Sequence, residues 1–143
     1  IGFASRTAGG VELSRLNMIL AVLERKAGLS LINQDVYVNV VGGLKPEGTS
    51  IDLAVALAIY STCKGLKNSG KLLAVGEIGL TGDLRPIRNA EKIIREAERM
   101  GFTKAVIPQK NAARLTDVPG GIAVVGVNSL SEAIQIVRQP SRM

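Results

Sequence analysis

The amino-acid sequence contains no histidine, and this absence excludes several kinds of site. A chain without histidine cannot by itself supply a Ser-His-Asp triad, a Cys-His pair or a histidine-ligated metal. Aromatic residues make up only 3% of the chain, which disfavours binding of single-stranded nucleic acid by base stacking. The only cysteine, Cys63, rules out an internal disulfide and fits a reducing compartment, so we expect a cytoplasmic protein.

Membrane and cofactor motifs are missing as well. No apolar run approaches the roughly 18 residues that a membrane helix needs. The chain does not open on the charged and apolar regions of a signal peptide. It contains neither the CxxC pairs of a zinc ribbon nor the GxxxxGK[ST] pattern of a P-loop. We therefore expect no membrane partner, and no cofactor or metal held by this chain.

The residues that are present describe a basic globular domain. Of the 143 residues, 46% are hydrophobic and 21% charged, which suits one domain with a sizeable core. The net charge is +6 and the pI about 9.8, which indicates an anionic partner, most obviously nucleic acid. The charge fits equally well a mildly basic protein that has no such partner.

The stretch Val36–Tyr60 organises the rest of the chain. Valines alternate with polar residues over Val36–Val40, which is typical of a strand. Over Ile51–Ile59 the only polar side chain is Asp52, which predicts a helix buried on most sides. A glycine-rich loop joins this strand to this helix.

The end of that loop has two interpretations. Thr49 and Asp52 have the spacing of a capping box, and either Thr49 or Ser50 could accept a hydrogen bond from the first N–H groups of the helix. Alternatively, Ser50 is a nucleophile. Because the chain lacks histidine, the base for such a serine would have to be a lysine.

The first half of the chain also predicts a helix beginning at Leu13, with leucines at helical spacing and Gly28 as its C-terminal cap. Arg6 and Arg15 lie near its start. We expect both arginines to be solvated, with an oligomer interface or a phosphate contact as the alternative.

The second half alternates strands and helices. Gly76–Ile87 predicts a hairpin that turns near Gly82, with Pro86 at the end of a strand. The next helix has an inner face of apolar residues and ends at Gly101. This inner face consists of Ala90, Ile93, Ile94, Ala97 and Met100.

The later predicted elements are strands at 104–108 and 122–127, a helix at 111–115, and a helix that begins after Ser129, where Ser129 and Glu132 form a capping box. This alternation predicts an α/β fold with parallel pairing, and the hairpin makes the sheet mixed, in the manner of an α+β fold. We expect residues 1–10 to be a linker remnant of a longer protein, 11–138 a single domain, and 139–143 a tail.

Several blocks of sequence resemble the proteolytic domain of Lon proteases. They are GLKPEGTSIDLA from Gly43, VGEIGLTGDLRPI from Val75, RLNMILAVLERKAG from Arg15, NQDVYVNVVGG from Asn33 and GFTKAVIP from Gly101. Together these blocks cover most of the chain. They resemble more closely the Lon-like C-terminal domain of the RadA (Sms) family of bacterial DNA repair ATPases.

The resemblance implies a fold and a parent protein. The fold would be that of the Lon proteolytic domain, with the architecture of ribosomal protein S5 domain 2. The parent protein would carry an N-terminal zinc ribbon and a RecA-like ATPase, so zinc, ATP and magnesium are expected there and not in this chain. Such proteins form hexameric rings that drive DNA branch migration in recombinational repair.

The resemblance also lets the Ser-Lys dyad of Lon be compared residue by residue. The Lon motif Asp-Gly-Pro-Ser-Ala-Gly aligns with Glu47–Asp52, so Ser50 keeps the serine position but Ile51 follows it. The lysine position falls on Glu91, and Lys92 is one residue further, roughly 100° around a helix. We expect no peptidase activity and a vestigial Ser50. The alternative is an active Ser-Lys peptidase in which a one-residue shift brings Lys92 into place.

Basic residues are the remaining candidates. Four of them repeat at i, i+4, i+7 and i+11, which places a cationic stripe on one helix face. We expect contacts to the DNA backbone, because nothing in the sequence resembles a recognition helix. The alternative is a solvated face with intrahelical pairs, such as Glu91 with Arg95. The candidate DNA-binding residues are Lys45, Arg85, Arg88, Lys92, Arg95 and Arg99.

Three functions therefore compete. The first is a proteolytically inactive Lon-like domain that assembles a hexameric ring and offers a surface to DNA. The second is an active Ser-Lys peptidase, and the third a purely structural oligomerisation domain.

Overall fold

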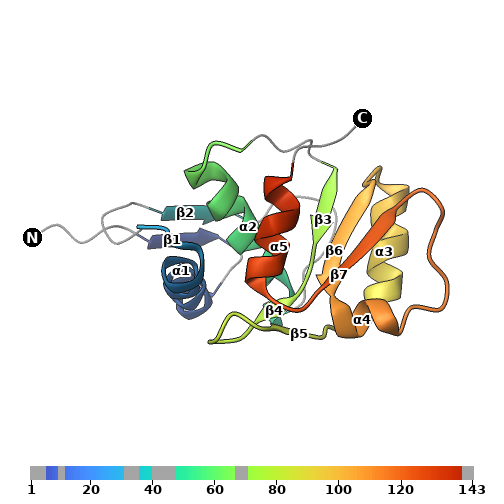
Figure 1. The fold of residues 1–143 in the computed structure, drawn as a ribbon, viewed down its shortest axis with the longest axis horizontal. Helices are drawn as coiled ribbons and strands as arrows, with labels where there is room; N and C mark the ends of the chain where they lie inside the picture. The colour runs from blue at the N-terminus through green and yellow to red at the C-terminus, as the bar shows by residue number, and fades with distance from the viewer. Residues whose placement is uncertain (1–5, 10–11, 31–35, 40–47, 67–70, 140–143) are drawn as a thin grey trace, which may run out of the picture.

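A computed structural model describes residues 6–9, 12–30, 36–39, 48–66 and 71–139 of the chain. Figure 1 shows the arrangement of its helices and strands. Their order is β1 (Arg6–Gly9), α1 (Leu13–Ala27), β2 (Val36–Asn39), the 3-10 helix η1 (Gly48–Ile51), α2 (Asp52–Cys63), β3 (Leu72–Ala74), β4 (Glu77–Ile78), β5 (Leu84–Arg85), α3 (Ala90–Arg99), β6 (Lys104–Pro108), α4 (Gln109–Ala113), β7 (Ala123–Val127) and α5 (Leu130–Arg138).

A parallel sheet of order β3-β6-β7 lies between α5 on one face and α3 on the other (Figure 1). Leu72 pairs with Lys104, and Lys104 pairs with Ala123, so the three strands start at the same edge. Residues 105–108 of the middle strand are all buried, as expected for a strand covered on both faces. The predicted α/β class is confirmed.

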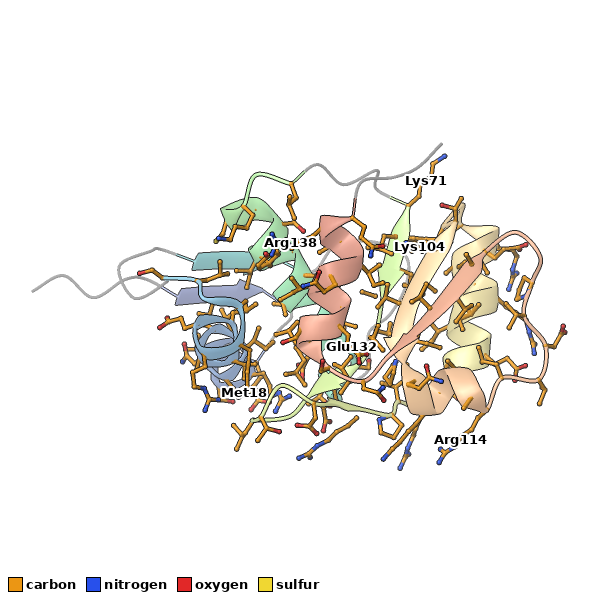
Figure 2. The ribbon with its side chains drawn as sticks, viewed as in Figure 1. Met18, Lys71, Lys104, Arg114, Glu132 and Arg138 are labelled. Carbon is orange, nitrogen blue, oxygen red and sulfur yellow. The ribbon has the colours of Figure 1, made fainter. Side chains whose placement is uncertain are left out.

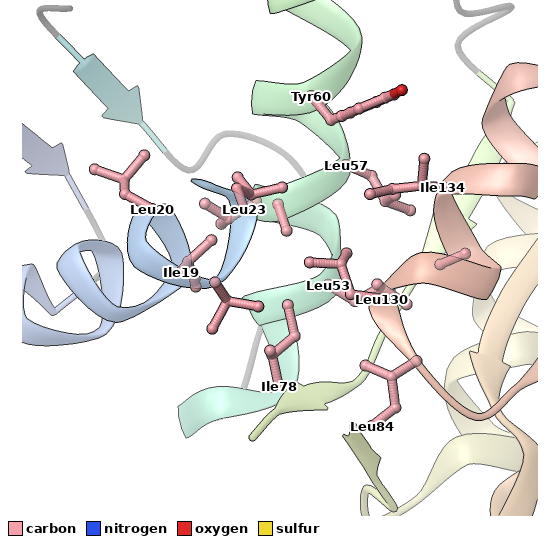
Figure 3. Packing of buried hydrophobic residues seen from close by; sticks show 14 of the residues in the cluster. Ile19, Leu20, Leu23, Leu53, Leu57, Tyr60, Ile78, Leu84, Leu130 and Ile134 are labelled. Atoms are coloured by element: carbon pink, nitrogen blue, oxygen red, sulfur yellow. The ribbon is translucent and has the colours of Figure 1, made fainter. Parts of the chain in front are cut away.

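The larger hydrophobic core fills the space between one face of the sheet, α1, α2, α5 and β4 (Figure 3). Leu53 and Leu57 of α2 lie beside Leu130 and Ile134 of α5, and Ile19 of α1 approaches from the other side. Because α2 contacts α1, α5 and β4, its apolar side chains are covered on most sides, as the sequence predicts.

The smaller core lies on the opposite face of the sheet, under α3. Ala105 and Ile107 point to this face while Val106 belongs to the larger core, which is the alternation of a strand. From α3, Ile94 and Ala97 are buried here, as predicted. Met100 was expected on the same inner face but is 48% exposed, because α3 ends at Arg99 and Met100 is its C-cap residue.

The hairpin forms where the sequence predicts it, between Glu77–Ile78 and Leu84–Arg85. Pro86 follows directly after β5. The hairpin strands were expected to join the main sheet. Among the described residues they instead form an antiparallel sheet of their own, and β1 and β2 form a second small parallel sheet. The backbone of the hairpin is held by the rest of the chain, since the N–H of Leu84 donates to the carbonyl of Asn128 (3.0 Å) and the N–H of Leu130 to the carbonyl of Gly82 (2.8 Å).

Two predicted helix ends are confirmed. Gly28 ends α1 with a left-handed φ of 69°, and its N–H donates to the carbonyl of Leu23. Ser129 is the N-cap of α5, where its hydroxyl accepts from the N–H of Glu132 at 3.2 Å. The Glu132 carboxylate in turn accepts from the N–H of Asn128 at 2.7 Å. In the part of the chain described above, no helix is long and apolar enough to cross a membrane.

Candidate functional site

The loop that carries Ser50 is tied to the segment before the hairpin. The carbonyl of Ser50 accepts from the N–H of Gly76 at 2.8 Å, and the carbonyl of Gly76 accepts from the N–H of Leu53 at 3.0 Å. The hydroxyl of Thr49 donates to the carboxylate of Glu77. Ser50 itself is half-buried. These contacts thus fix the start of α2 against residues Gly76 and Glu77.

The predicted capping box of Thr49 and Asp52 is wrong. The N-cap residue of α2 is Ile51, which makes no side-chain hydrogen bond to the helix. Thr49 is bound to Glu77 and therefore points away from the helix N–H groups. A 3-10 turn over residues 48–51 leads into the helix in place of the cap.

Asp52 has a different role, because it forms a buried ion pair with Arg15. The Asp52 side chain is 1% exposed and that of Arg15 27% exposed. The same carboxylate accepts the N–H of Ile78 at 3.0 Å, and Arg15 also donates to the carbonyl of Ile78 at 3.2 Å. Burial raises the pKa of Asp52 above its usual value, while the Arg15 hydrogen bond and the Ile78 N–H act in the opposite direction.

Arg15 is therefore not the solvated residue that the sequence predicted. Its partner lies 37 positions away, so no local pattern identifies the pair. One signal was available in the sequence. Asp52 is the only polar side chain over Ile51–Ile59, and a buried carboxylate needs a partner.

Glu91, which stands at the lysine position of the Lon dyad, is bound to the loop after α4. Its carboxylate accepts from the N–H of Asp117 at 2.7 Å, and from the N–H (3.3 Å) and hydroxyl (2.9 Å) of Thr116. The N–H of Asp117 and the hydroxyl of Thr116 lower the pKa of Glu91 below its usual value. Lys92 is exposed, as the helix pattern predicts.

The predicted cationic stripe on α3 is largely balanced by acids of the same helix. Arg99 pairs with Glu96 at 2.7 Å, and Arg95 lies 4.0 Å from Glu91. The sequence of α3, AEKIIREAER, holds as many acidic as basic residues. Lys45 lies outside the described residues. The stripe therefore offers little net positive charge.

A denser group of cations gathers where β6 ends and α4 begins. Asn111 of α4 is buried, and its side-chain amide both accepts from the N–H and donates to the carbonyl of Ile87, each at 2.9 Å. These two bonds hold the segment between β5 and α3 against α4. Arg85 ends β5, the segment carries Arg88, and α4 carries Lys110.

We call Arg85, Arg88, Lys110 and Arg114 the carboxyl-edge cluster, because these residues lie at the carboxyl ends of the parallel strands. All four are exposed, and Figure 2 shows Arg114 at the end of α4. Arg85 lies 3.5 Å from Glu77 and 3.8 Å from Asp83, so its charge is partly balanced. Within the described residues the other three have no ion pair.

The sequence missed Lys110 and Arg114 as candidates. They follow no helical repeat with Arg85 and Arg88, and only the Asn111 contact with Ile87 brings the two segments together. Among the described residues, no group of three or more metal-ligating side chains could hold an ion.

Comparison with known proteins places the chain in a family. Residues 11–111, more than half of the chain, match the sequence model of the family described as subunit ChlI of Mg-chelatase. The chain belongs to this family.

Individual curated relatives show a more specific similarity than the family model does. The chain is 45% identical over 136 residues to the DNA repair protein RadA of Streptococcus pyogenes (serotype M6), which covers 95% of this chain and 30% of that protein. It is 37% identical over 135 residues to the DNA repair protein RadA of Halalkalibacterium halodurans, covering 94% of this chain and 29% of that protein. The DNA repair protein RadA of Escherichia coli is 41% identical over 131 residues, 92% of this chain and 28% of that protein. The chain thus spans about 30% of the length of these relatives.

Proposed function

We propose that this chain is the DNA-binding and assembly domain of a RadA-type DNA repair protein. It has the fold of the Lon proteolytic domain and no proteolytic activity. The similarity to RadA proteins over nearly the whole chain supports the repair role. In the parent protein, zinc, ATP and magnesium would be held by parts outside this chain.

The observation that carries the DNA contact is the carboxyl-edge cluster. Arg88, Lys110 and Arg114 are exposed and have no carboxylate partner among the described residues, so phosphates can take that place. Contacts of this kind go to the DNA backbone and read no bases. The α3 stripe contributes less, because Glu91 and Glu96 already balance it.

Titration of a labelled DNA duplex at low salt tests this proposal. The Arg88→Glu/Lys110→Glu variant should weaken binding at the carboxyl-edge cluster at least tenfold, equally for duplexes of different sequence. The matched control, Arg95→Glu/Arg99→Glu, makes the same charge change on α3 and should weaken binding less than threefold. Undetectable binding of the unmodified chain at low salt, or a larger loss in the control, would overturn the proposal.

Two arrangements support the absence of peptidase chemistry at Ser50. The Glu91 carboxylate is occupied by three hydrogen bonds from Thr116 and Asp117. Lys92 is exposed to solvent, whereas a Ser-Lys mechanism needs a lysine desolvated beside the serine. Incubation with casein should give no cleavage; cleavage that disappears in Ser50→Ala would establish a peptidase instead.

Assembly is tested by light scattering on the same sample. A domain that serves as the platform of a ring should give the mass of a hexamer. A ring-sized mass without DNA binding would select the purely structural oligomerisation domain.

A further inference from the structure

A second group of cations lies at the opposite edge of the parallel sheet. Lys71 directly precedes β3, Lys104 begins β6, and Arg138 ends α5 (Figure 2). We call these three residues the amino-edge cluster, because they lie where the parallel strands begin. None of them belongs to the DNA contact proposed above.

The topology places the backbones of all three at the same edge of the sheet, with Arg138 on the α2 side of α5 and Lys71 and Lys104 on its other side (Figure 2). The carbonyl of Lys71 accepts from the N–H of Thr103 at 3.0 Å, which sets the backbones of residues 71 and 104 side by side. Lys104 lies two residues before Val106 and so shares its face of the strand, the face covered by α5. Since α5 starts at the carboxyl edge, next to β7, and runs back along the sheet, its last residue, Arg138, returns to the amino edge (Figure 1).

The amino-edge cluster keeps its positive charge. Within the described residues, Lys71, Lys104 and Arg138 have no ion pair. The acidic residue of α5, Glu132, is in its first turn and thus at the other end of the helix. Glu98, in the last turn of α3, lies close to Gly121 just before β7, so this acid is at the same edge, on the face of the sheet that α3 covers.

The two clusters face away from each other. The middle strand, Lys104–Pro108, has 5 residues and spans about 17 Å at roughly 3.3 Å per residue, and the clusters extend beyond its two ends. On one face of the sheet, α3 runs between the edges and has balanced charges. DNA is stiff, with a persistence length of roughly 150 base pairs, so a short duplex held at one edge cannot bend around to the other.

We propose that the amino-edge cluster is a second DNA backbone site, so that one chain holds two separate DNA segments at opposite edges of its sheet. This inference rests on the proposed DNA-binding function and adds to it a capacity to bridge. Lys71, Lys104 and Arg138 contact phosphates, as Arg88, Lys110 and Arg114 do on the other side.

Stoichiometry tests this inference. A short duplex is titrated into the full chain at low salt, and the duplexes bound per chain at saturation are counted by sedimentation or calorimetry. We expect two for the unmodified chain. We expect one for Lys71→Glu/Arg138→Glu and one for Lys110→Glu/Arg114→Glu. The matched control Arg25→Glu/Lys26→Glu, on α1, makes the same charge change and should keep two.

A bridging assay gives the second readout. One duplex is fixed to a bead, the chain is added, and retention of a second, labelled duplex is measured. Lys71→Glu/Arg138→Glu should still bind the fixed duplex but lose retention of the labelled one at least fivefold. The neutral variant Lys71→Gln/Arg138→Gln should retain the labelled duplex to a degree between that of the unmodified chain and that of Lys71→Glu/Arg138→Glu. Circular dichroism checks that each variant is folded.

The outcomes separate this inference from the proposed function. No duplex bound by the unmodified chain would remove both. One duplex per chain, or bridging unchanged in Lys71→Glu/Arg138→Glu, would overturn the second site and leave the proposed function in place. Loss of all binding in Lys71→Glu/Arg138→Glu would overturn the second site and the carboxyl-edge contact together, since a single site would then lie at the amino edge.

Discussion

The ion pair of Arg15 and Asp52 shows how much one buried charge can organise. The Asp52 carboxylate is bound by Arg15 from α1 and by the N–H of Ile78 from the hairpin, so three segments meet at one side chain. A buried charge is tolerated only when it is paired and hydrogen-bonded. The contact therefore fixes α1, α2 and β4 relative to one another.

Removing the arginine should be strongly destabilising. Arg15→Met leaves the buried Asp52 carboxylate without its cation, and breaking such a pair lowers the free energy of unfolding by about 3 kcal/mol. The control Lys64→Met, an exposed cation at the end of α2, should change it by less than about 1 kcal/mol. Urea unfolding measures both. Equal effects of the two substitutions would show that the buried pair has no special role.

Glu91 should make stability depend on pH in the acid range. Its pKa in the folded chain is lowered, chiefly by the N–H of Asp117 and the hydroxyl of Thr116, below the ordinary value near 4.5. The folded state therefore binds this proton less readily than the unfolded state. The stabilisation is present above pH 4.5 and is lost as the pH falls through the lowered pKa.

Glu91→Gln removes the titrating group and should make the free energy of unfolding less dependent on pH in this acid range. Chemical unfolding at a series of pH values between about 6 and 3 measures the change. The control is Ser131→Ala on α5, which removes no ionisable group and should leave this pH dependence as it is. A Glu91→Gln curve parallel to that of the unmodified chain throughout would contradict the assignment.

At the scale of the elements, Asn111 acts as a clamp between α4 and the segment before α3. Its amide makes both hydrogen bonds that a neighbouring strand would make with Ile87. This buried contact sets the spacing of Arg88 and Lys110, which lie one residue from Ile87 and Asn111. Stability and DNA affinity are thus linked at one residue that carries no charge.

Asn111→Ala leaves the half-buried N–H and carbonyl of Ile87 without the Asn111 amide, which should lower the free energy of unfolding by about 2 kcal/mol. Since the segments that carry Arg88 and Lys110 are no longer tied, DNA affinity should also fall several-fold, although no cation is removed. Ser131→Ala, an exposed polar residue of α5, is the control for both measurements. A variant that is destabilised but binds DNA as before would show that the clamp does not position the cluster.

Elements set by neighbouring residues were predictable from sequence. The end of α1 at Gly28, the N-cap of α5 at Ser129 and the hairpin turn each depend on residues a few positions apart. What failed depends on distant partners. Thr49 binds Glu77 and Asp52 binds Arg15, so the capping box that their spacing predicts does not form.

The candidate site shows the same contrast: features set by nearby residues were predictable, and those set by distant partners were not. The helical repeat correctly placed Lys92 and Arg95 on the exposed side of α3. It could not show that Arg95 and Arg99 pair with acids, nor that Lys110 and Arg114 lie at the same edge as Arg88. The serine-loop interpretation and the inactive dyad remain predictions for the casein assay.

At the scale of the whole molecule, cations without an ion pair lie at both edges of the parallel sheet in the described part of the chain. The net charge of +6 therefore understates how strongly each edge attracts phosphate. Electrostatic attraction steers a polyanion toward such local fields and weakens as salt screens them.

Salt dependence measures the number of phosphates at one edge. With Lys71→Glu/Arg138→Glu as background, only the carboxyl-edge cluster remains, and its three unpaired cations should give a slope of log K against log salt of about −3. Adding Arg114→Ala should reduce that slope by about one, whereas adding Arg25→Ala should leave it unchanged. Affinity that does not vary with salt would contradict a backbone contact.

The hairpin has a consequence for how the chain folds. It is held by Asp52 at Ile78, by the carbonyl of Asn128 at Leu84, and by the side chain of Arg25 at the carbonyl of Leu80. All these partners lie 25 or more positions away, so the hairpin can settle only after distant parts of the chain have met. The amides of Ile78 and Leu84 should therefore exchange with solvent at a common slow rate, through opening of the whole domain rather than of the hairpin alone.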